Sequence, residues 1–416
     1  MQVCKPEILV HKSKPGCKVS VILLDWNVRE SFHSLDYLNQ QTADRDNYEL
    51  IWLEFYNHQP KALHEKVFAD PENPLIDKWL VAGYPDEYIF NKHRLYNLGI
   101  VLAEGEICVI CDSDAMFTPK FIERIIEEFT HTPNLILHLD EVRNVNRDLY
   151  PFCYPGMDVV LGDGCVNWHG TTTRGLDNSP DMLHDANYGA CMAARRSDLL
   201  AIGGADEHID YLGYICGPYE LTFRLRNAGR TERWLDDEYI YHTWHPNQNG
   251  INNDYQGPHD GKAMSLRSFD ALYTERIQTY VENPWIAQVK QGNEISADTL
   301  IRYLSEKEEP NWHVDEAPRQ WDDVYRVAPD YEGFAVYQCK HKFYGLPVDE
   351  GRFHPQFINR YDVLVEAKSL DELYVLMDYY NSLPQSMWKR VFSIPILHLP
   401  GRMLRRMKKE LVRLFC

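Results

Sequence analysis

The sequence predicts an α/β protein with a mixed, mostly parallel central sheet. Three observations lead to this class: short apolar runs of strand length, amphipathic helical segments between them, and acidic residues where the runs end. The hydrophobic content of 44% and the charged content of 25% are those of an ordinary globular protein. At 416 residues the chain is long enough for two or three domains.

Three apolar runs predict strands of this sheet. They are residues 18–27 (KVSVILLDWN), 48–54 (YELIWLE) and 107–111 (ICVIC). Continuous apolar runs without polar alternation are typical of parallel strands that are buried on both faces. Ligands of such sheets bind at the carboxyl ends of the strands, and acidic residues occupy these ends. The acids are Asp25, Glu54, Asp112 and Asp114.

Helical patterns follow the first and third runs. A helix is expected over residues 31–41, and residues 119–130 (PKFIERIIEEFT) have apolar side chains at helical spacing with Pro119 near the first turn. Further along, residues 218–228 predict a helix that ends at Gly229, a residue suited to the position after a helix.

Two segments between these elements predict loops. Residues 150–187 are rich in Gly, Asn, Asp and Thr and indicate a long functional loop, and residues 247–262 are rich in turn residues. The chain then changes character, with a helical stretch over 264–306, a β-hairpin over 333–346, and a strand and helix over 362–378. Ser369 and Glu372 form the capping box of this last helix. The elements after residue 263 predict a small α+β appendage.

The end of the chain carries a strong local charge. The whole chain has a formal net charge of −19, which argues against a nucleic-acid partner, yet residues 389–416 hold eight basic residues and one acid. From residue 402 onward, apolar and basic side chains occupy different faces of a helix, a pattern typical of a helix lying on an anionic membrane. The alternatives are a helix packed on the acidic body of the same protein and a dimer contact.

Composition also predicts location. No run of about 18 apolar residues is present, and residues 1–20 lack the apolar core of a signal peptide. The ten cysteines form no disulfide framework, which suits a reducing compartment. Cys108 and Cys111 are expected to be buried thiols, because no second cysteine pair completes a zinc site. We therefore expect a cytoplasmic protein, peripheral on the cytoplasmic face of a membrane if the tail binds lipid.

The pair Asp112 and Asp114, separated by Ser113, is the strongest sign of chemistry. In an extended segment residues i and i+2 point the same way, so both carboxylates can converge at the end of the third strand. Converging anionic oxygens suit Mg²⁺ or Mn²⁺, which would hold a diphosphate. The alternative is a polar turn after a buried strand.

Four segments in order resemble family 2 glycosyltransferases of the GT-A fold over residues 18–246. KVSVILLDWN resembles the family's first strand, with Leu24, Asp25 and Trp26 replacing Pro, Thr and Tyr. YELIWLEFYN resembles its second strand and retains the first of two acids. The other two segments are NLGIVLAEGEICVICDSDAMFTP, around the D-x-D pair, and NYGACMAARRSDLLAIGGADEHID.

The resemblance implies a nucleotide-sugar site. Trp26 would stack on the base, Glu54 would accept its ring N–H and so favour uridine, and Arg94 would contact phosphate. Asp112 would meet the ribose or the water shell of the metal, and Asp114 would bind the metal directly. The donor-binding residues implied are Leu24, Asp25, Trp26, Glu54, Arg94, Asn97, Asp112, Ser113 and Asp114.

The general base is the main departure from the family. Where the family has an E-D pair, this chain has Gly217 and Pro218, and only Glu220 remains. An inverting transfer needs a carboxylate within hydrogen-bond reach of the acceptor hydroxyl, which Glu220 could supply. Asp206 and Asp210 are the rival candidates, and Glu220 is otherwise only an acid at a helix N-terminus.

Two histidines in HTWHP (242–246) complete the implied site. The family often carries a histidine here that approaches the metal or the diphosphate, and neutral imidazole is a competent ligand beside carboxylates. His242 and His245 are therefore expected to join Asp112 and Asp114 at the metal. The segment GPHDG (257–261) would act as a lid, with His259 or Asp260 touching the donor.

The resulting hypothesis is an Mn²⁺- or Mg²⁺-dependent hexosyltransferase that moves a sugar from a UDP-sugar to a glycan or lipid-linked acceptor with inversion, as in polysaccharide biosynthesis. The alternatives are a retaining transferase and a degenerate GT-A protein that binds nucleotide sugar or glycan without turnover. A nucleotidyltransferase would also need a metal carboxylate pair, but the two downstream segments do not support it. The expected domains are a GT-A domain (1–262), a helical and α+β domain (263–385) and a basic amphipathic tail (386–416).

Overall fold

The chain forms two compact units, residues 1–319 and 320–416, and each is described by itself. The computed structural model describes residues 4–27, 29, 31–86, 88, 90–170, 172–173, 187–208, 211, 218–246, 271–272, 274–306, 324–339, 341–350, 353, 361 and 363–382. The expected basic tail, the expected lid and Asp210 lie outside these residues. None of the described helices is long and apolar enough to cross a membrane.

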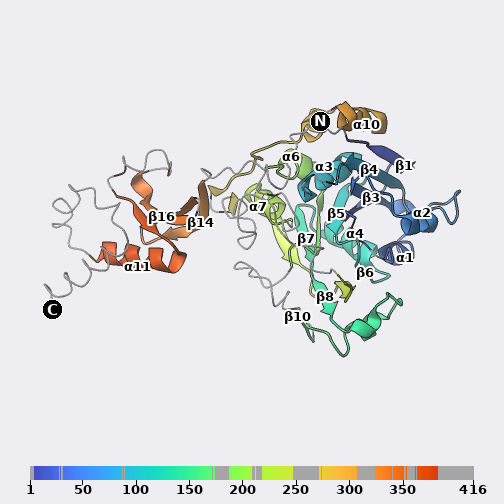
Figure 1. Cartoon of the computed structure of the whole chain (residues 1–416), viewed down its shortest axis with the longest axis horizontal. Helices are drawn as coiled ribbons and strands as arrows, with labels where there is room; N and C mark the ends of the chain where they lie inside the picture. The colour runs from blue at the N-terminus through green and yellow to red at the C-terminus, as the bar shows by residue number, and fades with distance from the viewer. Residues whose placement is uncertain are drawn as a thin grey trace. The chain divides into compact units, whose positions relative to one another are not determined.

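The first unit is built on an eight-stranded mixed sheet with the order β1-β4-β3-β2-β5-β11-β7-β12 (Figure 1). Its strands are β1 (Glu7–His11), β2 (Val19–Asp25), β3 (Tyr48–Tyr56), β4 (Lys78–Tyr84), β5 (Ile107–Cys111), β7 (Leu135–Leu139), β11 (Cys191–Arg195) and β12 (Thr231–Trp234). The four strands β4, β3, β2 and β5 run parallel, and β1 and β11 are antiparallel to their neighbours. The predicted mixed α/β class is confirmed.

The centre of the sheet is β2, in which every residue is buried. Alternate side chains enter two separate cores, because successive residues of a strand point to opposite faces: Val21 and Leu23 on one side, Ile22 and Leu24 on the other. The register places Asp25 opposite Glu54 of β3. The acids at the strand ends therefore share one edge of the sheet.

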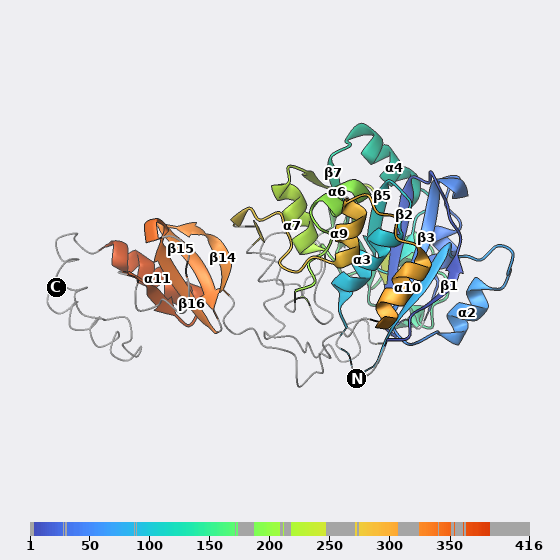
Figure 2. The same ribbon diagram turned by 90° about the horizontal axis from the view of Figure 1, so that it is seen from above.

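Helices cover both faces of this sheet. The helices among the described residues of the first unit are α1 (Ser34–Leu38), α2 (Lys61–Val67), α3 (Lys92–Leu102), α4 (Phe121–His131), α5 (Met157–Val160), α6 (Arg196–Ala201), α7 (Tyr219–Asn227), α9 (Pro284–Lys290) and α10 (Ala297–Glu306), with 3₁₀ turns η1 (Arg45–Asn47) and η2 (Arg147–Leu149). The apolar side chains of α1, α2 and α4 enter one core, and those of α3, α6, α7, α9 and α10 enter the other. Figure 2 shows α3 and α9 side by side, in agreement with their contacts.

Local sequence explains how α3 begins and how closely it packs. The side chain of Asn91 caps the helix by accepting from the backbone N–H of Arg94. A Cβ at Gly99 would lie 2.5 Å from the Ile22 side chain, so glycine allows the helix to approach β2 closely. This helix was not predicted from the sequence, although it carries the Asn97 and Gly99 of the family resemblance.

A three-stranded sheet, β6-β13-β8, joins distant parts of the chain beside the main sheet. Its strands are β6 (Met116–Phe117), β8 (Glu141–Asn144) and β13 (Ile240–Thr243). In β13, Tyr241 pairs with Met116 on one side and with Val142 on the other. Because β6 begins two residues after Asp114, this pairing brings the 242–246 segment to the end of β5. The short strands β9 (Trp168–His169) and β10 (Thr172–Thr173) form a hairpin.

The described residues of the second unit form an antiparallel sheet, β14-β15-β16-β17, with an α-helix and a 3₁₀ turn. Its elements are β14 (Val324–Tyr331), β15 (Phe334–Cys339), β16 (Lys342–Pro347), η4 (Val348–Glu350), β17 (Val365–Ala367) and α11 (Leu370–Asn381). The Ser369 side chain accepts from the Glu372 N–H, as expected for a capping box, and the Glu372 carboxylate reaches back to the N–H of Lys368, one residue before the N-cap. A Cβ at Gly345 would lie 2.6 Å from Met377 Sδ, so α11 packs closely on β16.

Several elements differ in extent from their predictions. The helix expected over 31–41 spans only Ser34–Leu38, and the helical stretch expected over 264–306 contains the short helices α9 and α10 in its described part. The expected loop 150–187 includes α5 and the β9–β10 hairpin. The domain boundaries expected at residues 262 and 385 stay predictions, although α9 and α10 pack against α3, α6 and β1 of the first unit.

Candidate functional site

The D-x-D turn is held firmly at the carboxyl edge of the sheet. The backbone N–H of Asp112 donates to the carbonyl of Ala190 at 3.0 Å, which continues the ladder between β5 and β11. The hydroxyl of Ser113 donates to the carbonyl of Leu24 at the end of β2, at 2.5 Å. These bonds attach the turn to both neighbouring strands. The carboxylates of Asp112 and Asp114 therefore have a fixed position at this edge of the sheet.

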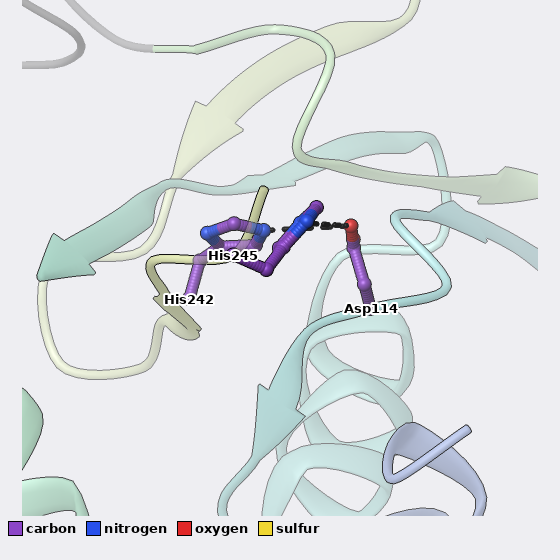
Figure 3. Close-up of side chains that lie close together, drawn as sticks. All are labelled: Asp114, His242 and His245. Atoms are coloured by element: carbon purple, nitrogen blue, oxygen red, sulfur yellow. Dashed lines mark hydrogen bonds and ion pairs between the residues drawn. The ribbon is translucent and has the colours of Figure 1, made fainter. Parts of the chain in front are cut away.

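Asp114, His242 and His245 converge on one point (Figure 3). The Asp114 Oδ2 atom lies 3.4 Å from His242 Nε2 and 3.2 Å from His245 Nε2, and one ligand atom from each residue lies within 4.8 Å of the others. Two ligands placed about 2.1 Å from one ion at right angles stand about 3 Å apart. The spacing and the donor atoms therefore fit a divalent cation.

Arg29 also contacts this cluster. Its guanidinium forms an ion pair with Asp114 Oδ2, and its Nε donates to Ser113 Oγ at 2.7 Å. Burial by itself would raise the pKa of Asp114, but Arg29 and the two histidines together outweigh burial and hold the pKa well below its usual range. Asp114 is thus a carboxylate in the folded protein, the form that a metal requires.

The two acids of the D-x-D turn differ in their surroundings. Asp112 is not in the Asp114–His242–His245 cluster found among the described residues. Burial raises the pKa of Asp112 to about 6; Lys92 opposes this rise, and the charges of Asp114 and Glu141 add to it. Its proposed place at the metal, as ligand or through water, stays a prediction.

A pocket lies beside the cluster. It is small and open to solvent, and it is lined by Leu24, Trp26, Arg29, Lys92, Tyr96, Ile110, Cys111, Asp112, Ser113 and Gly189. Trp26 stacks on Phe90 with ring centroids 4.5 Å apart, and the cationic groups of Arg29 and Lys92 lie 5.0 and 5.7 Å from the Trp26 ring. The pocket therefore combines an aromatic ring with two cations. Lys92 and Tyr96 were missed because they lie on α3, which was not predicted.

Asp25 and Glu54 are not among the residues that line this pocket. Both are fully buried. Glu54 Oε1 accepts from the Trp52 indole at 2.8 Å, and Asp25 Oδ1 accepts from the Trp26 N–H at 2.7 Å. Burial, followed by the charge of Asp25, raises the pKa of Glu54 well above its usual value. The contact of Glu54 with a base stays a prediction.

Arg94 and Asn97 hold a neighbouring turn in the structure. The Asn97 amide donates to the Ala205 carbonyl at 2.9 Å and accepts from the Ala205 N–H at 2.7 Å. Arg94 lies 3.7 Å from the Glu207 carboxylate and donates to the Tyr84 hydroxyl at 3.2 Å. Neither residue lines the pocket. Their contacts connect α3 to the turn that follows α6.

Glu220 and Asp206 are both fully buried. Glu220 accepts from Arg224 Nε at 2.5 Å and from the Asp206 N–H at 2.9 Å. Asp206 accepts from the backbone N–H groups of Tyr280 at 2.7 Å and Val281 at 3.0 Å. A general base must reach the acceptor hydroxyl, and these bonds occupy the oxygens of both carboxylates. The contacts favour a supporting role for both residues.

Two functional neighbours of the cluster were missed by sequence reasoning. His33 Nε2 lies 2.8 Å from the Asp114 carbonyl, and burial lowers the pKa of His33 to about 4, so it is neutral. Glu141, on β8, lies 3.8 Å from His242 Nδ1 and is also buried. No local pattern marks either residue, because the pairing of β8 with β13 brings Glu141 to the site and the start of α1 brings His33 there.

Comparison with known proteins gives structural likeness at low identity. No protein-family model matches the sequence, and no curated protein matches it. The fold is similar to S. aureus TarS 1–349 in complex with UDP-GlcNAc (TM-score 0.43, 15% identity, 70% of this chain and 73% of that chain). It is similar to the mannosyltransferase PcManGT from Pyrobaculum calidifontis in complex with GDP-Man and Mn²⁺ (0.39, 15%, 72% and 73%). GalNAc-T7 with UDP, GalNAc and Mn²⁺ is a third (0.42, 11%, 79% and 67%). These TM-scores lie below 0.5, so the function proposed next rests on the residues of this chain.

Proposed function

We propose that the chain is a metal-dependent glycosyltransferase that uses a nucleotide-diphosphate sugar, with UDP-sugars favoured, and a glycan or lipid-linked acceptor. The convergence of Asp114, His242 and His245 beside a pocket that holds an aromatic ring and two cations carries this proposal. A diphosphate needs positive charge, a base needs an aromatic face, and this arrangement offers both at the end of the central strands.

Each part of the site has a distinct task in the proposal. Asp114, His242 and His245 would hold the metal, which when bound stabilises charge on the departing diphosphate. Lys92 and Arg29 lie where they would neutralise phosphate, and Trp26 offers a ring to the base. Arg29 both pairs with Asp114 and lines the pocket.

A protein that binds nucleotide sugar without turnover is the second candidate. The observation that favours it is the engagement of Glu220 and Asp206 in buried bonds, which leaves the inverting reaction without the base expected from the sequence. A retaining transfer is a further alternative. Hydrolysis of a UDP-sugar separates enzymes from binders, and the anomeric configuration of the product distinguishes inversion from retention.

Nucleotide binding is tested by thermal unfolding with UDP, GDP and CDP, each with and without Mn²⁺. A ligand at 100 times its Kd adds about 2.7 kcal/mol to the free energy of unfolding, so the Tm should rise by about 4 °C or more with Mn²⁺ and UDP. The rise should be smaller without metal. If no nucleotide shifts the Tm under either condition, the chain has no donor site of this kind.

The donor set predicts that Mn²⁺ binds in preference to Mg²⁺. Two of the three side-chain ligands are imidazoles, whereas Mg²⁺ prefers oxygen ligands. In an electron paramagnetic resonance titration, about a tenfold excess of Mg²⁺ should displace little Mn²⁺.

His245→Ala should weaken Mn²⁺ binding by about tenfold or more, since loss of an outer-shell partner alone costs that much. His131→Ala, at an exposed position on α4, is the matched control; equal affinities in the two variants would remove His245 from the site.

The acceptor and the membrane contact rest on the sequence. Residues 402–416, expected to lie on an anionic membrane, are outside the described residues, and a cytoplasmic location stays a prediction. A lipid-linked acceptor would suit such a tail, because enzyme and substrate would then share one surface. Flotation of the full chain with anionic vesicles, compared with a chain ending at residue 401, measures the contact.

A further inference from the structure

Glu141 is a buried carboxylate that lies outside the proposed set of metal ligands. It begins β8, the parallel neighbour of β13, which carries His242. Its side chain is 1% exposed, and its Oε1 atom lies 3.8 Å from His242 Nδ1. The opposite ring nitrogen, Nε2, faces Asp114 at 3.4 Å. The imidazole of His242 thus lies between two carboxylates.

The contacts of His242 leave one polar atom unsatisfied. Its Nδ1 atom is buried and has no hydrogen-bond partner among the described residues. At 3.8 Å, Glu141 is beyond the distance of a direct hydrogen bond and acts on Nδ1 through its charge. In a buried site with little water this charge is weakly screened. A proton on Nδ1 is therefore stabilised by the adjacent carboxylate.

We propose that Glu141 is a positioning residue that stabilises a proton on Nδ1 of His242. The other ring nitrogen, Nε2, then carries no proton, and its lone pair is available to the metal. The inference rests on the proposed metal site and identifies the group that orients one of its ligands. A metal-ligating imidazole must carry its proton on the other nitrogen, and carboxylates that stabilise this proton raise the basicity of the ligand. Glu141 is placed to do so for His242.

The surroundings of Glu141 fix the direction of its carboxylate. The Asn187 amide donates to Oε2 at 3.0 Å, and the Arg143 guanidinium lies 3.3 Å from Oε1. Asn187 also accepts from the Gly189 N–H at 3.0 Å, and Gly189 lines the pocket. The carboxylate is therefore anchored to the wall of the pocket, and its charge remains next to His242.

Two substitutions of Glu141 separate the effect of its charge from the effect of its shape. Glu141→Gln keeps the volume and an acceptor oxygen for Asn187 but removes the charge, whereas Glu141→Asp keeps the charge on a shorter side chain. Positioning through charge predicts that Mn²⁺ affinity falls by about tenfold to hundredfold in Glu141→Gln and is partly restored in Glu141→Asp. A purely structural role predicts the reverse order. Glu238→Gln, a buried acid bonded to Thr118, is the matched control.

The experiment measures Mn²⁺ affinity by electron paramagnetic resonance and counts the coordinated imidazole nitrogens by electron spin-echo spectroscopy. Two coupled nitrogens are expected in the wild-type protein and in Glu238→Gln, and a weakened second coupling in Glu141→Gln, at an unchanged Tm without metal. Wild-type affinity and two full couplings in Glu141→Gln would overturn the inference. If the wild-type protein binds no Mn²⁺, or Asp114→Asn binds it normally, the metal site itself is wrong and the inference fails with it.

Discussion

Replacing Asp114 should abolish metal-dependent nucleotide binding and donor turnover. Its Oδ2 atom is the point at which His242, His245 and Arg29 meet, so replacing it removes the one carboxylate of the cluster found among the described residues. We expect Asp114→Asn to weaken Mn²⁺ binding by about hundredfold or more, since even outer-shell substitutions cost tenfold to hundredfold. The Tm increase with UDP and Mn²⁺ should disappear with it.

The control for this substitution addresses stability. Asparagine keeps the volume of the side chain, but Arg29, only 9% exposed at its side chain, loses the charge of its partner. Circular dichroism and the Tm without ligand must therefore show a folded protein. Asp237→Asn, an exposed acid on the same unit, should leave metal and nucleotide binding unchanged. A folded Asp114→Asn protein that UDP and Mn²⁺ still stabilise would disprove the metal site.

The largest effect on stability is expected at Glu220. Glu220 and Arg224 form an ion pair one helical turn apart on α7, and both side chains are 0% exposed. Arg224 also donates to the carbonyls of Ile202 and Gly204 and so holds the turn after α6. Glu220→Ala leaves a buried guanidinium without its counter-charge, so the free energy of unfolding should fall by about 3–5 kcal/mol.

Urea unfolding measures this loss, with Glu128→Gln as the matched control. Glu128 also pairs with two arginines, but Arg233 is 50% exposed and the expected cost is below about 1 kcal/mol. Glu220→Gln tests the base predicted from the sequence. A stable Glu220→Gln protein with normal nucleotide binding and no turnover would support Glu220 as the base; a destabilised protein whose remaining folded fraction turns over normally would support the structural role.

The same ion pair predicts how stability depends on pH. Burial alone would raise the pKa of Glu220, but Arg224 and His93 hold it below its ordinary value of 4.5. The unfolded chain therefore binds a proton at a higher pH than the folded chain does. The contribution of Glu220 is fully present above about pH 4.5 and is lost as the pH falls through the lower pKa of the folded state. As the pH is lowered through this range, the urea concentration at the midpoint of unfolding should fall less steeply for Glu220→Gln than for the wild-type protein.

The local sequence was sufficient to predict three central strands of the main sheet. The runs that become β2, β3 and β5 were identifiable because strands buried on both faces need continuous apolar residues. The helices α4 and α7 were found from helical spacing and from Gly229, which has φ +83°. The strands β7, β11 and β12 were missed, since a short strand gives little signal without its neighbours.

The candidate site was predicted only in part. The D-x-D turn and the two histidines were identified as candidates from their own segments, and the structure brings Asp114 and both histidines together. Glu54, Arg94 and Asn97 were expected at the donor, but their described contacts are with Trp52, Glu207 and Ala205. Sequence resemblance fixes a position in the chain, whereas burial and neighbouring groups decide what a side chain at that position can contact.

The sequence by itself determined the α/β class, the central strands and the acids at their ends, because these depend on residues that are adjacent in the chain. Tertiary structure alone decided which of those acids joins the histidines. The pairing of β13 with β6 and β8 brings residues more than a hundred positions apart into one cluster and places Glu141 behind His242. The tertiary structure also pairs Glu220 with Arg224, because a charge that is buried away from water must have a partner.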